Sequence, residues 1–188
     1  MGPALFAMGR DLLRDRELNP VVAPRTILNG PITGARRVAA QSWEIDRIRA
    51  VARSYGVTIN DVVCAMVSGA FRAYLLELGA LPDDPLTAMC PVSLSLREER
   101  AGRTGGPSGN QVGAIIVNLA TQLEHGPDRL AAIAQSSSSA KAALNDLSPL
   151  QALAVSAVRV SPMALTMVPG YVKAANPPFN LVISNVPG

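Results

Sequence analysis

Residues 58–78 read TINDVVCAMVSGAFRAYLLEL, and this stretch decides the fold of the chain. Its apolar residues recur at the i, i+3, i+4 spacing of a helix face, and Gly79 follows as a terminator. Thr58 is suited to cap the helix, with Asp61 three residues on as a shorter stand-in for the glutamate of a capping box. The apolar stripe is wide, so we expect a largely buried helix.

Shorter elements flank this helix on both sides. Apolar periodicity and β-branched content predict, in chain order, a strand at 37–43, a helix at 44–55, strands at 86–95 and 112–121, a helix at 128–147 and a strand at 179–184. Strands and helices do not strictly alternate. The fold class that we predict is α/β, a two-layer sandwich of one mixed sheet with flanking helices.

The first part of the chain differs from the rest in composition. Residues 1–16 alternate apolar and charged side chains like a short amphipathic helix, and residues 19–34 hold three prolines and two glycines, which is typical of a linker. We therefore expect residues 1–34 to form an amphipathic segment and a linker. Residues 35–188 are long enough to bury one core and are expected to form one domain.

The composition of the chain favours some classes of binding partner and argues against others. A hydrophobic share of 48% and a charged share of 16% suit a surface that meets a partner half or lipid. The net charge of +3 is scattered and the seven aromatic residues are not interleaved with it, which argues against nucleic acid. The N-terminus lacks an apolar signal core and no uncharged apolar run reaches about 18 residues. We predict a cytoplasmic protein, with peripheral contact to the inner membrane or lipid droplets as an option.

Two polar motifs have both a structural and a functional interpretation. Asn60 and Asp61 lie in the first helical turn, where short polar side chains satisfy free backbone N–H groups. Alternatively, they are an amide and a carboxylate held at a cleft, where they would orient another residue or a substrate. The sequence Asn185-Val186-Pro187-Gly188 follows an apolar strand and has the composition of a turn.

No residue of the chain stands out as a catalytic base, nucleophile or metal ligand. His125 is the only histidine and lies in a polar loop, so we expect a surface residue. Cys64 and Cys90 lie in apolar runs without CxxC spacing, as buried free thiols do in a reducing compartment. The sequence contains no Gly-x-Ser-x-Gly and no phosphate-binding loop with its Lys-Ser/Thr.

Several segments together resemble the wax ester synthase/diacylglycerol acyltransferase family of actinobacteria and their relatives. The matching segments are PRTILNG at 24–30, TINDVV at 58–63, PVS at 91–93, GNQ at 109–111 and NLVISNVPG at 180–188. Each segment is short, but five in the family's order and at about its spacing are specific. The chain is therefore identified, by resemblance, with the C-terminal half of such an enzyme.

The resemblance implies a fold of two halves and places the catalytic base in the half that this chain does not contain. The family belongs to the coenzyme-A-dependent acyltransferases, which resemble chloramphenicol acetyltransferase and have two α/β halves with a channel between them. The first half carries His-His-x-x-x-Asp-Gly, whose second histidine deprotonates the acceptor hydroxyl, and this chain has no such motif. The resemblance makes Asn60 and Asp61 residues that support the site, and Asn185-Val186-Pro187-Gly188 a family motif.

The implied activity is O-acyl transfer that makes triacylglycerol or wax ester. Acyl-CoA would be the co-substrate, diacylglycerol or a fatty alcohol the acceptor, and no cofactor would be bound. The histidine-bearing N-terminal half would be the partner, and residues 35–188 would lack the last strands of the domain. Three alternatives remain: an inactive remnant of a split gene, a non-enzymatic binder of lipid surfaces through apolar residues 147–172, and a condensation-type or polyketide-associated acyltransferase.

Overall fold

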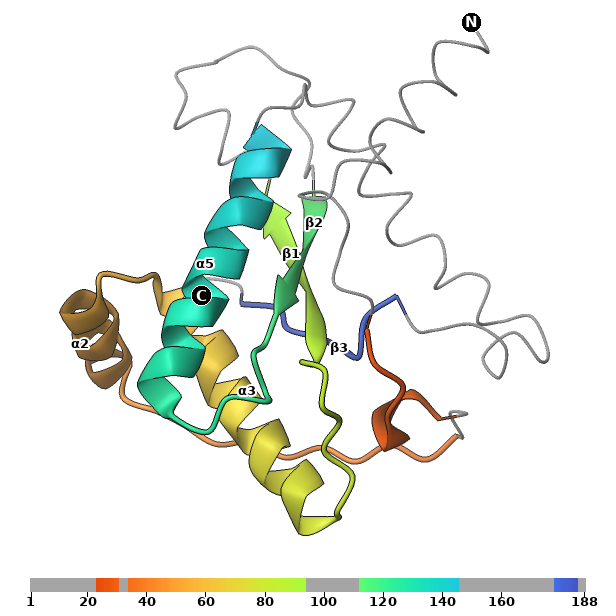
Figure 1. The fold of residues 1–188 in the computed structure, drawn as a ribbon. Helices are drawn as coiled ribbons and strands as arrows, with labels where there is room; N and C mark the ends of the chain where they lie inside the picture. The colour runs from red at the N-terminus through yellow and green to blue at the C-terminus, as the bar shows by residue number, and fades with distance from the viewer. Residues whose placement is uncertain (1–22, 31–33, 94–111, 146–177, 186–188) are drawn as a thin grey trace, which may run out of the picture.

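A computed structural model describes residues 23–30, 34–93, 112–145 and 178–185 of the chain (Figure 1). The elements of the described part are the short 3-10 helix η1 (Ile27–Asn29), α2 (Ile45–Tyr55), α3 (Ile59–Glu77), β1 (Thr87–Ser93), β2 (Val112–Asn118), α5 (Gly126–Asn145) and β3 (Leu181–Val182). The predicted amphipathic segment at 1–16, the last residues of the strand predicted at 86–95 and of the helix predicted at 128–147, and the apolar stretch 147–172 lie outside the described residues.

The strands form a mixed sheet in the order β2-β1-β3. β1 pairs with β2 in antiparallel register, with Thr87 opposite Asn118. β1 pairs with β3 in parallel register, with Ala88 opposite Leu181. The prediction of an α/β fold with one mixed sheet and flanking helices is confirmed.

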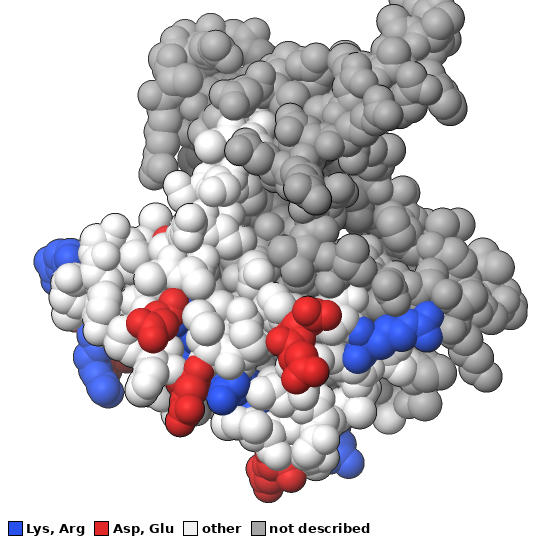
Figure 2. Space-filling model, viewed as in Figure 1, with Lys and Arg blue, Asp and Glu red and all other residues white. Residues whose placement is uncertain are grey.

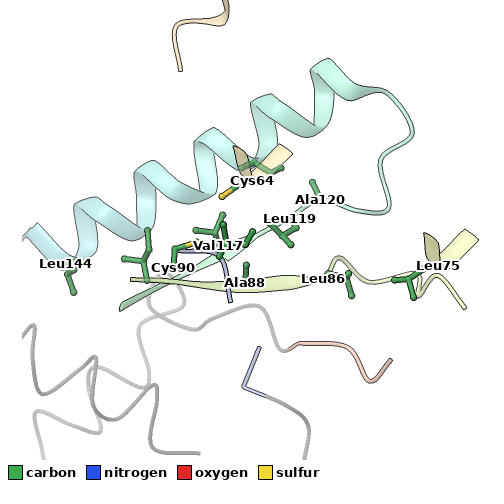
Figure 3. Close-up of a cluster of buried hydrophobic side chains, with 12 residues drawn as sticks. Cys64, Leu75, Leu86, Ala88, Cys90, Val117, Leu119, Ala120 and Leu144 are labelled. Atoms are coloured by element: carbon green, nitrogen blue, oxygen red, sulfur yellow. The ribbon is translucent and has the colours of Figure 1, made fainter. Parts of the chain in front are cut away.

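One face of the sheet is covered by α3 and α5 (Figure 1). The core lies between these layers (Figure 3), and its fully packed members are Cys64, Leu75, Leu86, Ala88, Cys90, Ile115, Val117, Leu119, Ala120, Ile133, Leu144 and Ile183. Side chains alternate between the two faces of a strand, so the cross-strand pairs Ala88–Val117 and Cys90–Ile115 point to the same side. That side is the one that meets the helices.

The long helix α3 confirms its predicted start and corrects its predicted burial. Thr58 and Asp61 form the expected capping box at its N-terminus. Near its C-terminus, Leu75 is fully buried, but Tyr74 and Leu76 are 49% and 52% exposed. The helix is therefore not largely buried, because only one of its faces meets the core layer.

By length and composition, α3 is the one helix in the described part of the chain that could cross a membrane. Length and composition are weak evidence, since the core helix of a water-soluble protein passes the same test. α3 packs against α5, and Ser68 Oγ donates a hydrogen bond of 2.6 Å to the Leu119 carbonyl. Arg72 donates to the Thr121 carbonyl at 2.8 Å. These contacts fit a layer helix of a folded domain.

The predicted strand at 37–43 is wrong. Residues 35–44 have no regular secondary structure and are exposed, with Val38 at 93%. A strand needs a neighbour for its backbone hydrogen bonds, and none of the three strands within the described ranges pairs with this segment. The helix predicted to follow it is confirmed as α2. The predicted final strand is confirmed only over its two-residue centre, β3.

Gly56 ends α2 in the left-handed conformation, at φ 65°, and its N–H bonds to the carbonyls of Ala52 and Arg53. Because a side chain is strained at this φ, Gly56→Ala should lower the free energy of unfolding by about 1 kcal/mol. Gly30→Ala is the matched control. Gly30 has φ −72° and an added Cβ would lie 3.7 Å from the nearest atom. Urea unfolding of both variants measures the difference, and equal stabilities would contradict the role of Gly56.

Candidate functional site

The polar motifs singled out from the sequence lie at one edge of the sheet. β1 and β3 are parallel, so their C-terminal ends meet at the same edge, and the Ile183 N–H bonds to the Met89 carbonyl at 3.0 Å. Residues 183–185 follow that bond toward the edge. Figure 3 shows Cys64 near Cys90, on the side of the core toward Leu144, and Leu75 beside Leu86 at the opposite end, so α3 runs antiparallel to β1. The N-terminus of α3 therefore lies at the same edge.

We call this the site edge and define it by Asn60, Asp61 and Asn185. Asn60 is half-buried, Asp61 is buried and Asn185 is exposed. The structure brings the motifs to a common edge without a direct hydrogen bond between Asn185 and the other two among the described contacts. Residues 186–188 of the predicted motif, Val186-Pro187-Gly188, lie outside the described residues. In open α/β sheets, ligands bind at the carboxyl ends of strands, which is where these residues lie.

The Asp61 carboxylate is used on one side only. Its Oδ2 accepts hydrogen bonds from the Thr58 N–H at 2.9 Å and the Thr58 hydroxyl at 2.6 Å. Its Oδ1 is buried and has no hydrogen-bond partner in the part of the chain that the structure describes. The capping interpretation is thus confirmed. A buried carboxylate oxygen without a donor costs free energy, so Oδ1 is suited to accept from a group beyond the described residues.

Asn60 lies beside the thiols under the site edge. Its Nδ2 is 3.9 Å from Cys64 Sγ, a weak contact. A hydrogen bond with the Cys90 thiol, together with burial, holds the pKa of Cys64 well above its ordinary value. The hydrogen bond with Cys64 lowers the pKa of Cys90, and burial opposes that shift. Both thiols are free and buried, as expected.

His125, the only histidine of the chain, is a surface loop residue, as predicted. His125 is exposed in the loop between β2 and α5, and its carbonyl accepts from the Arg129 N–H at 3.1 Å. Within the described ranges, no group of three His, Cys, Asp or Glu side chains is arranged to hold a metal ion. Among the described residues, the site edge therefore offers an amide and a carboxylate that can orient a group.

A buried hydrogen-bond network centred on Asn180 was not predicted from the sequence. Its Oδ1 accepts from the Thr87 N–H at 2.9 Å, and its Nδ2 donates to the Pro24 carbonyl at 2.7 Å and to Asn29 Oδ1 at 2.8 Å. We call these residues the Asn180 clamp. One feature of the sequence could have indicated this contact: residues 24–30 and residues 180–188 both resemble motifs of the same family.

The clamp holds a segment that its proline and glycine content had predicted to be a linker. Residues 24–30, which we call the strap, turn through η1, where Thr26 Oγ1 accepts from the Leu28 N–H at 3.2 Å and donates to Asn29 Oδ1 at 3.0 Å. Asn29 Nδ2 donates to the Phe179 carbonyl at 3.4 Å. The strap is thus bound to the segment that enters β3. The division of the chain at residue 34 stays a prediction.

Two family descriptions match the chain in succession. Residues 4–63 match the wax ester synthase/diacylglycerol acyltransferase catalytic domain, and residues 108–188 match the WS/DGAT C-terminal domain. The first match includes the strap together with Asn60 and Asp61. The second includes Asn180 and Asn185.

Relatives and a solved structure give the same family. A putative diacylglycerol O-acyltransferase of Mycobacterium tuberculosis is 49% identical over 100% of this chain and 41% of its own length. One of Mycobacterium bovis is 45% identical over 100% of this chain and 40% of its own length. The wax ester synthase/diacylglycerol acyltransferase of Marinobacter aquaeolei VT8 is 34% identical, with a TM-score of 0.66, over 98% of this chain and 38% of that one. The chain thus spans about two fifths of the length of these relatives.

Proposed function

The chain belongs to the wax ester synthase/diacylglycerol acyltransferase family, and on this basis we propose that it is part of an acyl-CoA-dependent O-acyltransferase that makes triacylglycerol or wax ester. The observation that carries the proposal is the succession of the catalytic-domain and C-terminal-domain matches along one chain. Acyl-CoA is the co-substrate and no bound cofactor takes part. Diacylglycerol or a fatty alcohol is the acceptor.

In this proposal the chain supports a reaction whose base comes from the family's other half. That half carries the histidine that removes the proton from the acceptor hydroxyl before attack on the thioester. The capping box holds Asp61 rigidly at the start of α3 and leaves Oδ1 without a donor. Asp61 then orients a donor group of that half, and the Asn60 amide lies beside it. Neither residue transfers the proton.

We also propose how this chain fits into the architecture of the whole enzyme. Residues 35–188 form one half of a chloramphenicol acetyltransferase-like pair of α/β halves, and the site edge faces the channel between them. The parallel alignment of β1 and β3, with the start of α3 at their C-terminal ends, supports this orientation. The histidine-bearing N-terminal half is accordingly the main partner.

The proposed location is the cytoplasm, with peripheral contact to the inner membrane or lipid droplets, because diacylglycerol resides in lipid. Figure 2 shows acidic and basic side chains scattered among neutral ones over the described face, with no field of one sign. That distribution suits neither nucleic acid nor a purely electrostatic membrane anchor. Contact with lipid would then depend on apolar surface.

Reconstitution tests the proposal. The purified chain is mixed with the separately expressed histidine-bearing part of the Mycobacterium tuberculosis relative, labelled acyl-CoA and diacylglycerol. We expect labelled triacylglycerol from the mixture and none from either part alone. A partner part whose base histidine is replaced by alanine is the control, and it should be inactive with this chain. A bound but inactive mixture, with fatty alcohols also failing as acceptors, would contradict the proposal.

A further inference from the structure

We propose that Asn180 is a positioning residue of the proposed acyltransferase, which fixes the strap against β1 and β3 and so sets how the catalytic domain meets the C-terminal domain. The inference rests on the proposed function for its catalytic consequence. Its structural part rests on the clamp alone. Asn180 is only 8% exposed, and its side chain joins segments that are up to 156 residues apart in sequence.

The clamp crosses the boundary between the two family matches. The strap belongs to the residues matched as catalytic domain, and Asn180 belongs to those matched as C-terminal domain. The third partner, Thr87, begins β1 between the two matches. A single side chain of the C-terminal match therefore bonds to the strap, which lies in the catalytic-domain match, and to the central strand of the sheet.

The hydrogen-bonding pattern requires an amide at position 180. Oδ1 faces a donor, the Thr87 N–H, while Nδ2 faces two acceptors, the Pro24 carbonyl and Asn29 Oδ1. A carboxylate of the same shape would keep the first bond and would turn an acceptor toward two acceptors. Because Asn180 is buried, little water is present to replace the two lost hydrogen bonds, and the folded state is destabilised.

Asn180 also sets the register of the segment that leads to the site edge. Its backbone N–H donates to the Thr87 carbonyl at 2.9 Å, and three residues later the Ile183 N–H donates to Met89 at 3.0 Å. Asn185 follows two residues beyond. A strap that comes loose would remove the support on which this register depends, so Asn180 acts through the strap and β3 and does not touch the reacting groups.

The first test compares Asn180→Asp with Asn29→Asp by amide hydrogen exchange of peptides that cover the strap. At pH 7, Asn180→Asp should raise the exchange rate of the strap by about tenfold or more, because two donated bonds are lost. Asn29→Asp keeps the oxygen that accepts from Asn180 and Thr26; it loses the long 3.4 Å bond to Phe179 and turns one carboxylate oxygen toward that single carbonyl. Its strap should therefore exchange within about threefold of wild type. Equal exchange in the two variants would overturn the proposal.

The pH dependence separates a hydrogen-bond role from a packing role. Below its pKa, the carboxyl introduced by Asn180→Asp regains an O–H donor and can bond again to Pro24 or Asn29. After correction for intrinsic exchange, protection of the strap in this variant should rise as the pH falls, and wild type should show no such rise. Protection that is independent of pH in the variant would mean that Asn180 only fills space.

The catalytic consequence is read in the reconstituted mixture. Asn180→Asp should lower kcat by about tenfold or more and leave the KM for acyl-CoA within about twofold, as expected when orientation and not binding is lost. An unchanged kcat with a loosened strap would overturn the positioning role. If the wild-type mixture itself is inactive, the proposed function fails, while the exchange and pH measurements still decide whether Asn180 holds the strap.

Discussion

Asp61→Asn should lower the kcat of the reconstituted enzyme by about a hundredfold, and the free energy of unfolding of the chain should stay within about 1 kcal/mol of wild type. The asparagine oxygen can still accept from the Thr58 N–H and hydroxyl, so the cap persists. The amide group would replace Oδ1, which has no hydrogen-bond partner among the described residues. A donor of the other half would then meet a donor and would lose its orientation. Labelled acyl transfer and urea unfolding measure the two quantities.

Two further variants control for the cap and for charge. Asp61→Ala removes both the cap and the acceptor, so stability should fall by about 1–2 kcal/mol together with activity. Asp46→Asn removes a carboxylate from the exposed surface of α2, where the Asp46 side chain is 84% exposed, and should change neither quantity. If Asp61→Asn transfers acyl groups like wild type, Asp61 is a cap and leaves the list of site residues.

The features that could be predicted are those that neighbouring residues determine. The Thr58–Asp61 capping box and the end of α2 at Gly56 depend on side chains and backbone angles within a few residues, and both are confirmed. The pairing of β-strands is harder to predict, because each strand needs a neighbouring strand that can be far away in the sequence. The segment 37–43 has the residues of a strand, yet no described strand lies beside it. β-Propensity alone could not show that.

The serines of α5 show how context reverses a local expectation. Serine side chains such as those at 136–139 compete for backbone hydrogen bonds and so disfavour the middle of a helix. In the structure Ser136 Oγ accepts from the Asn118 N–H of β2 at 2.9 Å, so the residue that weakens the helix joins it to the sheet. The Asn180 clamp escaped the sequence analysis for the same reason, since its bonds span about 150 residues.

The sequence predicted which residues form the candidate site, but it did not predict how they are arranged in space. Asn60 and Asp61 stood out because of their place in a helical turn and their match to a family motif, and the cap is confirmed. Their common edge with Asn185 depends on the parallel pairing of β1 and β3, which local patterns do not specify. That Asp61 Oδ1 lacks a partner could only be found in the folded structure.

Ile115→Ala should lower the free energy of unfolding by about 2–5 kcal/mol, which is a large share of the stability of a small domain. Ile115 is fully buried in the core layer between the sheet and its helices. The next residue of β2, Ile116, points to the opposite face and is only partly buried. Ile116→Ala is therefore the matched control, with the same atoms removed and a smaller expected loss, of about 1 kcal/mol. Urea unfolding of the full chain measures both variants.

The same experiment separates a folded acyltransferase part from an inactive remnant of a split gene. A part that folds as described should unfold in one cooperative transition, and Ile115→Ala should shift its midpoint to lower urea with little change in slope. Equal losses in the two variants would contradict the layering of the core on one face of the sheet. A broad transition without a defined midpoint, in wild type as in the variants, would favour the remnant, because a chain without a cooperative core cannot hold Asp61 and Asn180 in fixed positions.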